Sequence, residues 1–189
     1  MGSIFIRRAS TSEEMAGLRA LRIEVFVREQ GVPEEEELDS LDQTALHGVA
    51  WDGREVVATG RLVFLSGAEA QIGRMAVRAP LRRGGIGGEV LRFLEGEARA
   101  LGVRRILLHA QTYLVPFYRQ HGYLEEGSAF QEAGIEHILM RKSLSVAQST
   151  IQAHDPESVD WDELNENVNE AMIGHGRGDE DEGRGGLFD

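Results

Sequence analysis

The stretch that decides the fold reads IGRMAV at residues 72–77 and RRGGIGG at residues 82–88. The first part is a β-like run, and the second leads into a segment in which Val90, Leu94 and Ala98 share one helical face. The order is therefore strand, glycine loop, helix. Glycines let successive backbone N–H groups converge, and the helix adds the positive end of its dipole. This turn is predicted to suit a pyrophosphate.

The glycine loop taken alone has two interpretations of about equal weight, a phosphate cradle and a flexible turn with two exposed arginines. It matches neither G-x-G-x-x-G nor G-x-x-x-x-G-K-[ST]. A dinucleotide dehydrogenase and a P-loop NTPase are therefore disfavoured.

The chain before the loop predicts one helix and several strands. A strand is expected over 4–8, and Thr11 and Glu14 stand three apart as in a capping box, so a helix should run to about Arg28. The β-like runs 45–51 and 54–65 flank Asp52-Gly53, which predicts a hairpin with a two-residue turn. Between helix and hairpin lies an acidic stretch, 34–42, interpreted as a solvated loop or, less favoured, as a wall that attracts a cationic substrate.

The chain after the glycine loop alternates between the two periodicities. A buried strand is expected over 105–110, a short helix over 113–121 and a closing strand over 135–142. This mixed order predicts an α/β or α+β fold in which helices flank a mixed sheet, with its core within residues 3–144.

Charge and composition limit the function classes. Residues 1–144 hold 20 acidic and 18 basic side chains, whereas residues 145–189 hold 12 and 2, so the body is nearly neutral. We therefore expect no nucleic-acid partner. No apolar run is long enough for a membrane span or a signal peptide, which predicts a cytoplasmic protein without a membrane partner. The chain has no cysteine, and its six histidines form no metal-spaced pair, so no metal is expected.

Several motifs together resemble the GNAT superfamily of acyl-CoA-dependent N-acyltransferases over residues 3–144. Arg82, Gly85 and Gly87 give R-x-x-G-x-G directly after the 72–77 strand. Gln111, Phe117-Tyr118 and Gly122-Tyr123 follow the later pattern of that family, and RIEVFVREQ at 22–30 looks most like the small ElaA-like branch. The resemblance implies a strongly twisted mixed sheet in which two parallel strands splay apart to bind acyl-CoA.

The resemblance also implies roles for individual residues in the use of acetyl-CoA. Tyr118 matches the general acid that protonates the departing thiolate, and Arg82 lies beside the pyrophosphate. A phenol with a pKa of about 10 can donate to a thiolate whose thiol has a pKa of about 8.5. Gln111 stands where many members have asparagine, and the resemblance implies that its amide binds the cofactor, at the pantetheine or the helix start. The pantetheine arm pairs with the backbone of Met75, Ala76 and Val77, and the pyrophosphate is held by amides of Arg83, Gly84, Gly85, Ile86, Gly87 and Gly88.

The general base is left open among three residues. An alkylammonium has a pKa of about 10.4 and must lose a proton before it attacks a thioester. Glu29, His47 and His109 are the candidates, each more often structural when taken singly. An α-amino group, with its lower pKa, needs no strong base.

The C-terminal segment 145–189 is acidic and glycine-rich and is predicted to be largely disordered, with an amphipathic helix over 156–173. The leading hypothesis is an N-acetyltransferase that moves an acetyl group to a primary amine, on a small molecule or a peptide, by direct attack. An alternative is an acyl-CoA-binding sensor whose tail recruits a protein partner, and a third is an acyltransferase for longer acyl groups. Exposed strand edges suggest a homodimer.

Overall fold

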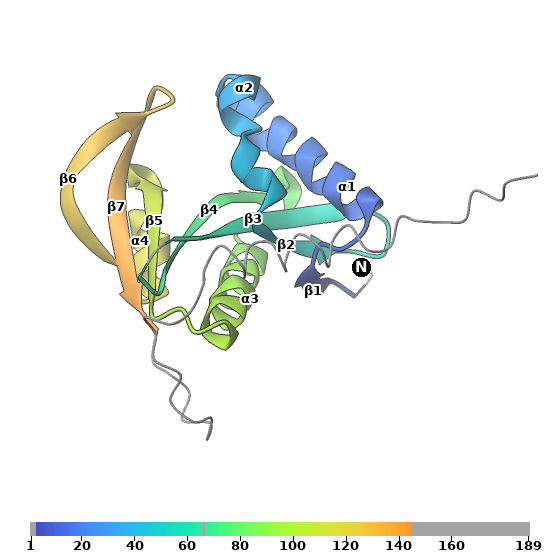
Figure 1. Ribbon diagram of the computed structural model, residues 1–189. Coiled ribbons are helices and arrows are strands. Elements are labelled where there is room, and N and C mark those ends of the chain that lie inside the picture. The colour runs from blue at the N-terminus through green and yellow to red at the C-terminus, as the bar shows by residue number, and fades with distance from the viewer. Residues whose placement is uncertain (1–2, 66, 145–189) are drawn as a thin grey trace, which may run out of the picture.

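The computed structural model describes residues 3–65 and 67–144, and these build one seven-stranded mixed sheet (Figure 1). The strand order is β1-β2-β3-β4-β5-β7-β6. Strands β4 and β5 pair in parallel, and the other neighbours in the described sheet pair antiparallel. The strands are β1 (Phe5–Arg8), β2 (Leu46–Trp51), β3 (Val56–Phe64), β4 (Glu69–Val77), β5 (Arg105–Gln111), β6 (Leu124–Glu132) and β7 (Ile135–Ser143).

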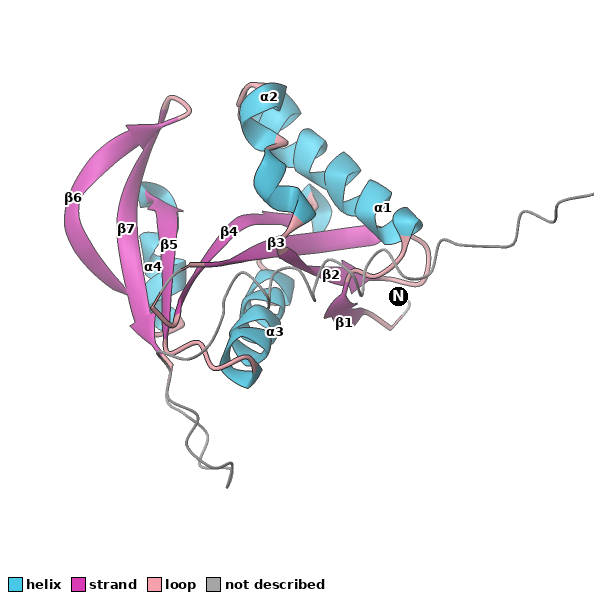
Figure 2. Ribbon diagram, viewed as in Figure 1, coloured by secondary structure: helices cyan, strands magenta, loops and turns pink. Residues whose placement is uncertain are grey.

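Helices cover both faces of the sheet (Figure 2). The N-terminal arm lies on one face and α3 on the other, each over its own apolar cluster. The arm holds α1 (Ser12–Arg22), the π-helix η1 (Ile23–Glu29), α2 (Glu34–Glu37) and the 3-10 turn η2 (Ser40–Gln43). The remaining helices are η3 (Ala79–Leu81), α3 (Ile86–Ala100), η4 (Thr112–Leu114) and α4 (Val115–Gln120).

The N-terminus of α1 forms as the sequence predicts, because its capping box is complete. The Thr11 hydroxyl accepts the backbone N–H of Glu14, and the Glu14 carboxylate accepts the N–H of Thr11. Leu18, Leu21 and Val25 are buried against the sheet. The expected single helix to Arg28 changes to π-helical hydrogen bonding from Ile23, a form concentrated at functional sites.

Strands β4 and β5 separate after a short paired stretch. Their register runs from Glu69 opposite Arg105 to Gln71 opposite Leu107. Beyond it, β4 continues to Val77 along β3, while β5 continues to Gln111 along β7 (Figure 1). We call these diverging segments, residues 72–77 and 108–111, the fork. The predicted α/β fold with a splayed parallel pair is confirmed in its architecture.

Two local features differ from the expectations. The hairpin of β2 and β3 is present, but Trp51 pairs with Val56, so its loop has four residues rather than two. The Asp52 carboxylate organises this loop by accepting the N–H groups of Arg54 and Glu55. Strand β6 has no counterpart among the expected strands, because almost all of it is exposed and its sequence has no apolar alternation.

Some predictions concern features beyond the described residues. Segment 145–189 lies outside the described residues, and so does the helix predicted over 156–173. The protein partner suggested for this segment also stays a prediction. In the described part of the chain, no helix is both long and apolar enough to cross a membrane. The cytoplasmic location, the homodimer and the domain boundary at residue 144 remain predictions.

Candidate active site

The glycine loop lies at the end of β4 and opens directly into α3. Gly85, with φ of +87°, is the residue before the helix, and Arg83 is also left-handed at +65°. A glycine adopts this backbone at no steric cost. Among the described residues, no side chain caps the N-terminus of α3. The first N–H groups of this 15-residue helix are therefore suited to a phosphate.

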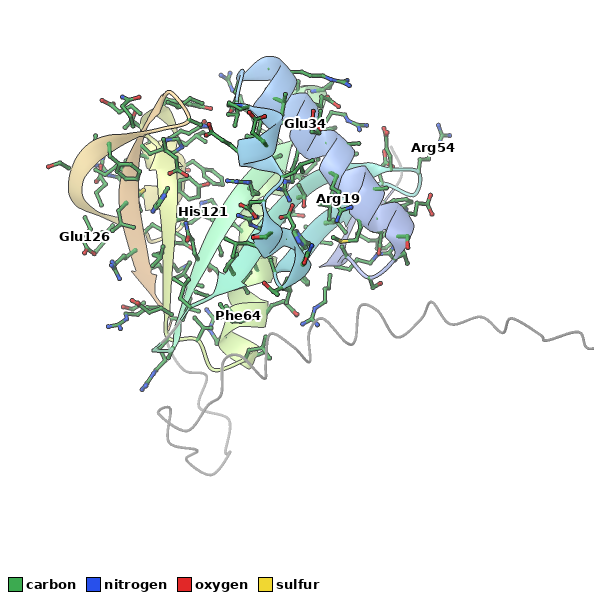
Figure 3. All side chains as sticks on the ribbon, turned by 45° about the horizontal axis from the view of Figure 1, so that its top comes forward. Arg19, Glu34, Arg54, Phe64, His121 and Glu126 are labelled. Carbon is green, nitrogen blue, oxygen red and sulfur yellow. The ribbon has the colours of Figure 1, made fainter. Side chains whose placement is uncertain are left out.

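The loop packs tightly against the end of β4 and against the end of α4. A Cβ on Gly87 would lie 3.3 Å from Cγ2 of Val77, and one on Gly88 would lie 2.6 Å from Nε2 of His121. His121, labelled in Figure 3, follows α4 and stacks at a tilt on Phe117, with ring centroids 4.6 Å apart. Glycine at residue 88 thus allows the start of α3 to approach α4.

Arg82 links the loop to the N-terminal arm. Its Nε donates to the carbonyl of Val77 at 2.8 Å, and its Nη2 donates to Oε2 of Glu29 at 2.6 Å. Both side chains are partly exposed. Glu29, one of the predicted base candidates, is therefore placed beside the glycine loop as the ion-pair partner of Arg82.

Tyr118 lies in α4, buried within the apolar cluster that also contains α3. Its ring meets Phe117 and Tyr123 edge to face, with centroids 5.0 and 5.9 Å away. Burial raises the pKa of Tyr118 well above its ordinary value, with a smaller contribution from Tyr113. The phenol is protonated at neutral pH with or without this shift, and the shift itself makes it a weaker proton donor.

A buried polar triad, which the sequence did not indicate, anchors the elements around Tyr118. The Tyr123 hydroxyl donates to Oε1 of Glu95 at 2.9 Å, and Lys142 Nζ donates to Oε2 of the same carboxylate at 2.6 Å. Burial and the neighbouring Glu95 raise the pKa of Tyr123. Glu95 belongs to α3, Lys142 to β7, and Tyr123 lies between α4 and β6, so the triad ties these elements together.

Gln111 ends β5 and faces the N-terminal arm. Its Nε2 donates to Oε1 of Gln30 at 3.0 Å, and its Oε1 accepts the hydroxyl of Tyr113. Gln30 directly follows Glu29, so consecutive residues at the end of η1 bind Gln111 at the end of β5 and Arg82, which in turn binds Val77 at the end of β4. The amide of Gln111 is thus engaged by protein groups rather than turned toward α3.

His109, two residues before Gln111, shares its face of β5, and its side chain contacts β6 across β7. Its Nδ1 lies 2.7 Å from Oε2 of Glu132, and its ring meets Phe130 edge to face at 5.0 Å. The hydrogen bond from His109 is the main cause that lowers the pKa of Glu132. With Nδ1 engaged by a carboxylate, Nε2 is the nitrogen that can exchange a proton with a substrate.

His47, the third base candidate, is fully buried in β2. Its Nε2 lies 3.1 Å from the carbonyl of Asp42, and burial lowers its pKa. The ring therefore has a structural position inside the sheet.

Over its whole length, the acidic stretch 34–42 is neither a solvated loop nor a wall that attracts a cationic substrate. Glu37 and Asp42 are buried, and with Asp39 they bind three arginines from α1, β3 and β4. Burial raises the pKa of Glu37, while in Asp42 the arginines outweigh burial and lower the pKa. The exposed carboxylates are those of α2 from Glu34, labelled in Figure 3, to Glu36. A solvated loop was wrong for the buried acids because arginines distant in sequence neutralise them.

Comparison with known proteins agrees with this architecture. The family model of the acetyltransferase (GNAT) domain matches residues 8–144. The chain belongs to the GNAT acetyltransferase family, whose members use acyl-CoA, and it is therefore an acyltransferase.

Individual relatives show which members of the family this chain is similar to. The chain is 40% identical over 136 residues to the uncharacterized N-acetyltransferase YjcF of Bacillus subtilis (strain 168), covering 71% of this chain and 96% of YjcF. It is 29% identical to an acyl-CoA N-acyltransferase from Pseudomonas aeruginosa, with a TM-score of 0.67 and coverage of 74% and 99%. Escherichia coli ElaA, at 26% identity, has the same TM-score and coverage. The predicted resemblance to ElaA-like proteins is confirmed.

Proposed function

We propose that this protein transfers the acetyl group of acetyl-CoA directly to a primary amine, with Tyr118 as general acid and His109 as general base. The observation that carries the proposal is the fork, because it leaves the β4 edge at Met75, Ala76 and Val77 unpaired toward β5 at the glycine loop. An unpaired strand edge can bind an extended pantetheine arm as an added strand. The family membership favours an enzyme over the alternative of a binding sensor.

The glycine loop holds the pyrophosphate in this proposal. The uncapped N–H groups at the start of α3 and the left-handed residues Arg83 and Gly85 present donors to the phosphates. Arg82 adds charge beside them, and its bond to Val77 keeps it at the end of β4. Glycine at 87 and 88 lets the start of α3 lie close to Val77 and His121, since a side chain there would meet these residues.

The transfer needs two proton movements, one on each face of the fork. His109 Nε2 accepts a proton from the attacking amine while Glu132 fixes the ring through Nδ1. Backbone N–H groups of the Met75–Val77 edge stabilise the negative charge that develops on the carbonyl oxygen. The C–N bond forms, the C–S bond breaks, and Tyr118 donates its hydroxyl proton to the departing thiolate.

We assign the base to His109 rather than to Glu29 because of their partners. Glu29 is paired with Arg82, which supports a role in holding the loop. His109 has a carboxylate on one nitrogen only, and this arrangement orients an imidazole for proton transfer. Gln111, bound to Gln30 and Tyr113, supports the shape of the fork beside the pantetheine.

The test is an assay of the full chain with acetyl-CoA and a panel of polyamines, aminoglycosides, amino acids and peptides, following free thiol and the mass of each amine. Tyr118→Phe should lower kcat by about 100-fold or more while the CoA dissociation constant stays within threefold. Tyr123→Phe is the matched control, because it removes a second buried hydroxyl and should reduce stability rather than kcat. An unchanged kcat in Tyr118→Phe would remove Tyr118 from the mechanism.

The base assignment has its own test. His109→Gln should lower kcat by about 100-fold and Glu132→Gln by less, because the imidazole remains but loses its orienting partner. His137→Gln is the control, since this ring stacks on Phe130 and bonds a carbonyl of its own strand. Equal rates for His109→Gln and wild type would exclude this base.

A further inference from the structure

The edge of β4 proposed to bind acyl-CoA begins with a β-bulge. In the pairing of β3 with β4, Thr59 lies opposite Ala76 and Arg61 opposite Gly73. One residue of β3, Gly60, therefore faces two residues of β4, Arg74 and Met75. Arg74 has a φ of +51°, a left-handed backbone that is unfavourable for a residue with a side chain.

The bulge changes the face to which the following residues point. Ile72 and Met75 stand three apart, yet both pack into the apolar cluster under α3. In a regular strand, residues three apart point to opposite faces. Ala76 accordingly packs under α1, and the Met75 side chain takes the space that a Cβ on Gly60 would occupy, since Sδ lies 2.4 Å from that position.

The side chain of Arg74 is fixed by the segment after α2. Nη2 donates to the carbonyl of Glu36 at 2.7 Å and to Oδ2 of Asp39 at 3.1 Å. Nε donates to the carbonyl of Glu37 at 3.2 Å and lies 3.0 Å from its Oε2. We call these four contacts the Arg74 clamp.

The acceptors of the clamp are themselves held in place. Glu37 also binds Arg22, which is fully buried, and Asp39 also binds Arg61. The clamp thus attaches the bulge to a rigid, partly buried group of charges on the face of the N-terminal arm. A strained backbone conformation persists only where its surroundings fix it in this way.

We propose that Arg74 is a positioning residue for acetyl transfer, because its clamp holds the left-handed bulge that aims Met75–Val77 into the fork. This inference rests on the proposed function. A one-residue slip of β4 would turn each following residue to the other face and each N–H to the other edge. The clamp therefore couples the segment 36–39 to the strand that receives the thioester.

Three substitutions distinguish the effect of the Arg74 clamp on activity from the effect of the left-handed backbone at residue 74. Arg74→Ala removes the clamp and keeps the steric penalty, and it should lower kcat/KM for acetyl-CoA by about 100-fold, the effect of a misplacement of about 1 Å. Arg74→Gly also removes the clamp but adopts the left-handed backbone freely, so it should recover at least about tenfold of that loss. Arg74→Lys keeps the charge without the guanidinium fork and should lose at least about tenfold.

The matched control is Arg141→Ala, which removes an arginine of β7 that binds Glu126 of β6 and Glu69 at the start of β4, away from the bulge. It should keep kcat within about threefold of wild type, whereas a loss of general stability would affect both variants alike. The thermal unfolding curve of each protein gives the folded fraction at the assay temperature, which is used to correct kcat and kcat/KM.

The outcomes are distinct. A corrected kcat/KM for Arg74→Ala within threefold of wild type, or a glycine variant no better than the alanine variant, overturns the proposal. If the alanine variant does not fold, the lysine variant decides, and wild-type activity in the lysine variant overturns the proposal.

Wild-type protein that acetylates no amine contradicts the proposed function instead. The CoA dissociation constants then test Arg74, since at least tenfold weaker binding by Arg74→Ala supports its role and equal binding refutes it.

Discussion

The substitution Arg22→Met tests whether the buried ionic group holds the N-terminal arm on the sheet. Arg22 is fully buried at the end of α1. Its three nitrogens donate to Oε1 of Glu37 at 2.5 Å, to the Glu37 carbonyl at 2.7 Å and to Oδ1 of Asp42 at 2.8 Å. Methionine matches only the aliphatic part of arginine and carries no charge, so the two carboxylates and the Glu37 carbonyl lose a partner.

The magnitude follows from the partners that remain. Removing one member of a buried ion pair destabilises a protein by about 3–5 kcal/mol when the other charge is left alone. Here Glu37 keeps Arg74 at 3.0 Å and Asp42 keeps Arg61 at 2.8 Å. We therefore expect the lower limit, about 3 kcal/mol. For a chain of this size that corresponds to a fall in Tm of about 6–12 °C.

The assay is urea unfolding at pH 7, followed by circular dichroism. The double variant Arg22→Met/Glu37→Gln is the internal control, because an amide needs no counter-charge, and it should regain about 1–2 kcal/mol. A loss below about 1 kcal/mol for Arg22→Met, or an additive further loss in the double variant, would refute the reasoning.

The same variant has a predicted pH dependence. Burial raises the pKa of Glu37 above its ordinary value of 4.5, so in the window above 4.5 the folded state binds more protons than the unfolded state. Stability from this group therefore falls as the pH rises through that window. Without Arg22 this dependence of stability on pH grows. The loss of unfolding free energy in Arg22→Met should therefore be smaller at pH 5 than at pH 7. A deficit that is constant with pH would contradict this.

Three further substitutions probe packing, capping and the loop. Gly60→Ala should lower the free energy of unfolding by about 1–3 kcal/mol, because its Cβ would lie 2.4 Å from Sδ of Met75 and 2.8 Å from Cδ1 of Leu94. Burial raises the pKa of Glu14, but hydrogen bonds from the start of α1 outweigh burial and lower the pKa below 4.5. The stabilisation from this carboxylate is therefore present above pH 4.5 and lost as the pH falls. Glu14→Gln should remove that part of the acid dependence in unfolding measured from pH 3 to 7. Gly85→Ala should weaken CoA binding by at least about tenfold in calorimetry and cost about 1 kcal/mol of stability, because alanine disfavours a φ of +87°.

Each of these has a result that contradicts it. Wild-type stability of Gly60→Ala would mean that β3 and α3 move apart easily. Parallel pH curves for Glu14→Gln and wild type would assign the acid dependence to other carboxylates. CoA affinity unchanged in Gly85→Ala would separate the glycine loop from the pyrophosphate, and Gly67→Ala serves as its control, since Gly67 is also left-handed but lies in the turn before β4.

Local chemistry in the sequence determined much of this protein. Short-range patterns reveal the capping box of Thr11 and Glu14, the apolar face of α3 and the left-handed glycine before that helix. Each of these features depends on residues that are close together in the sequence. The motif from Arg82 to Gly87 and the later Tyr118 indicated the family, and the family model confirms it. The family, and with it the use of acyl-CoA, could therefore be predicted from these local motifs.

Only the tertiary structure decided the contacts that close over long sequence distances. Strand β6 forms because β7 offers it a partner, although its own residues are exposed and carry no apolar alternation. Glu132 reaches His109 through that pairing, and an acid 23 residues away in the chain gives no periodic signal. Likewise, Arg74 adopts a left-handed bulge because carbonyls and carboxylates of the segment 36–39 hold it. Such groups are brought together by the folding of the sheet, so their pairing and their altered pKa values are properties of the packed molecule rather than of any stretch of sequence.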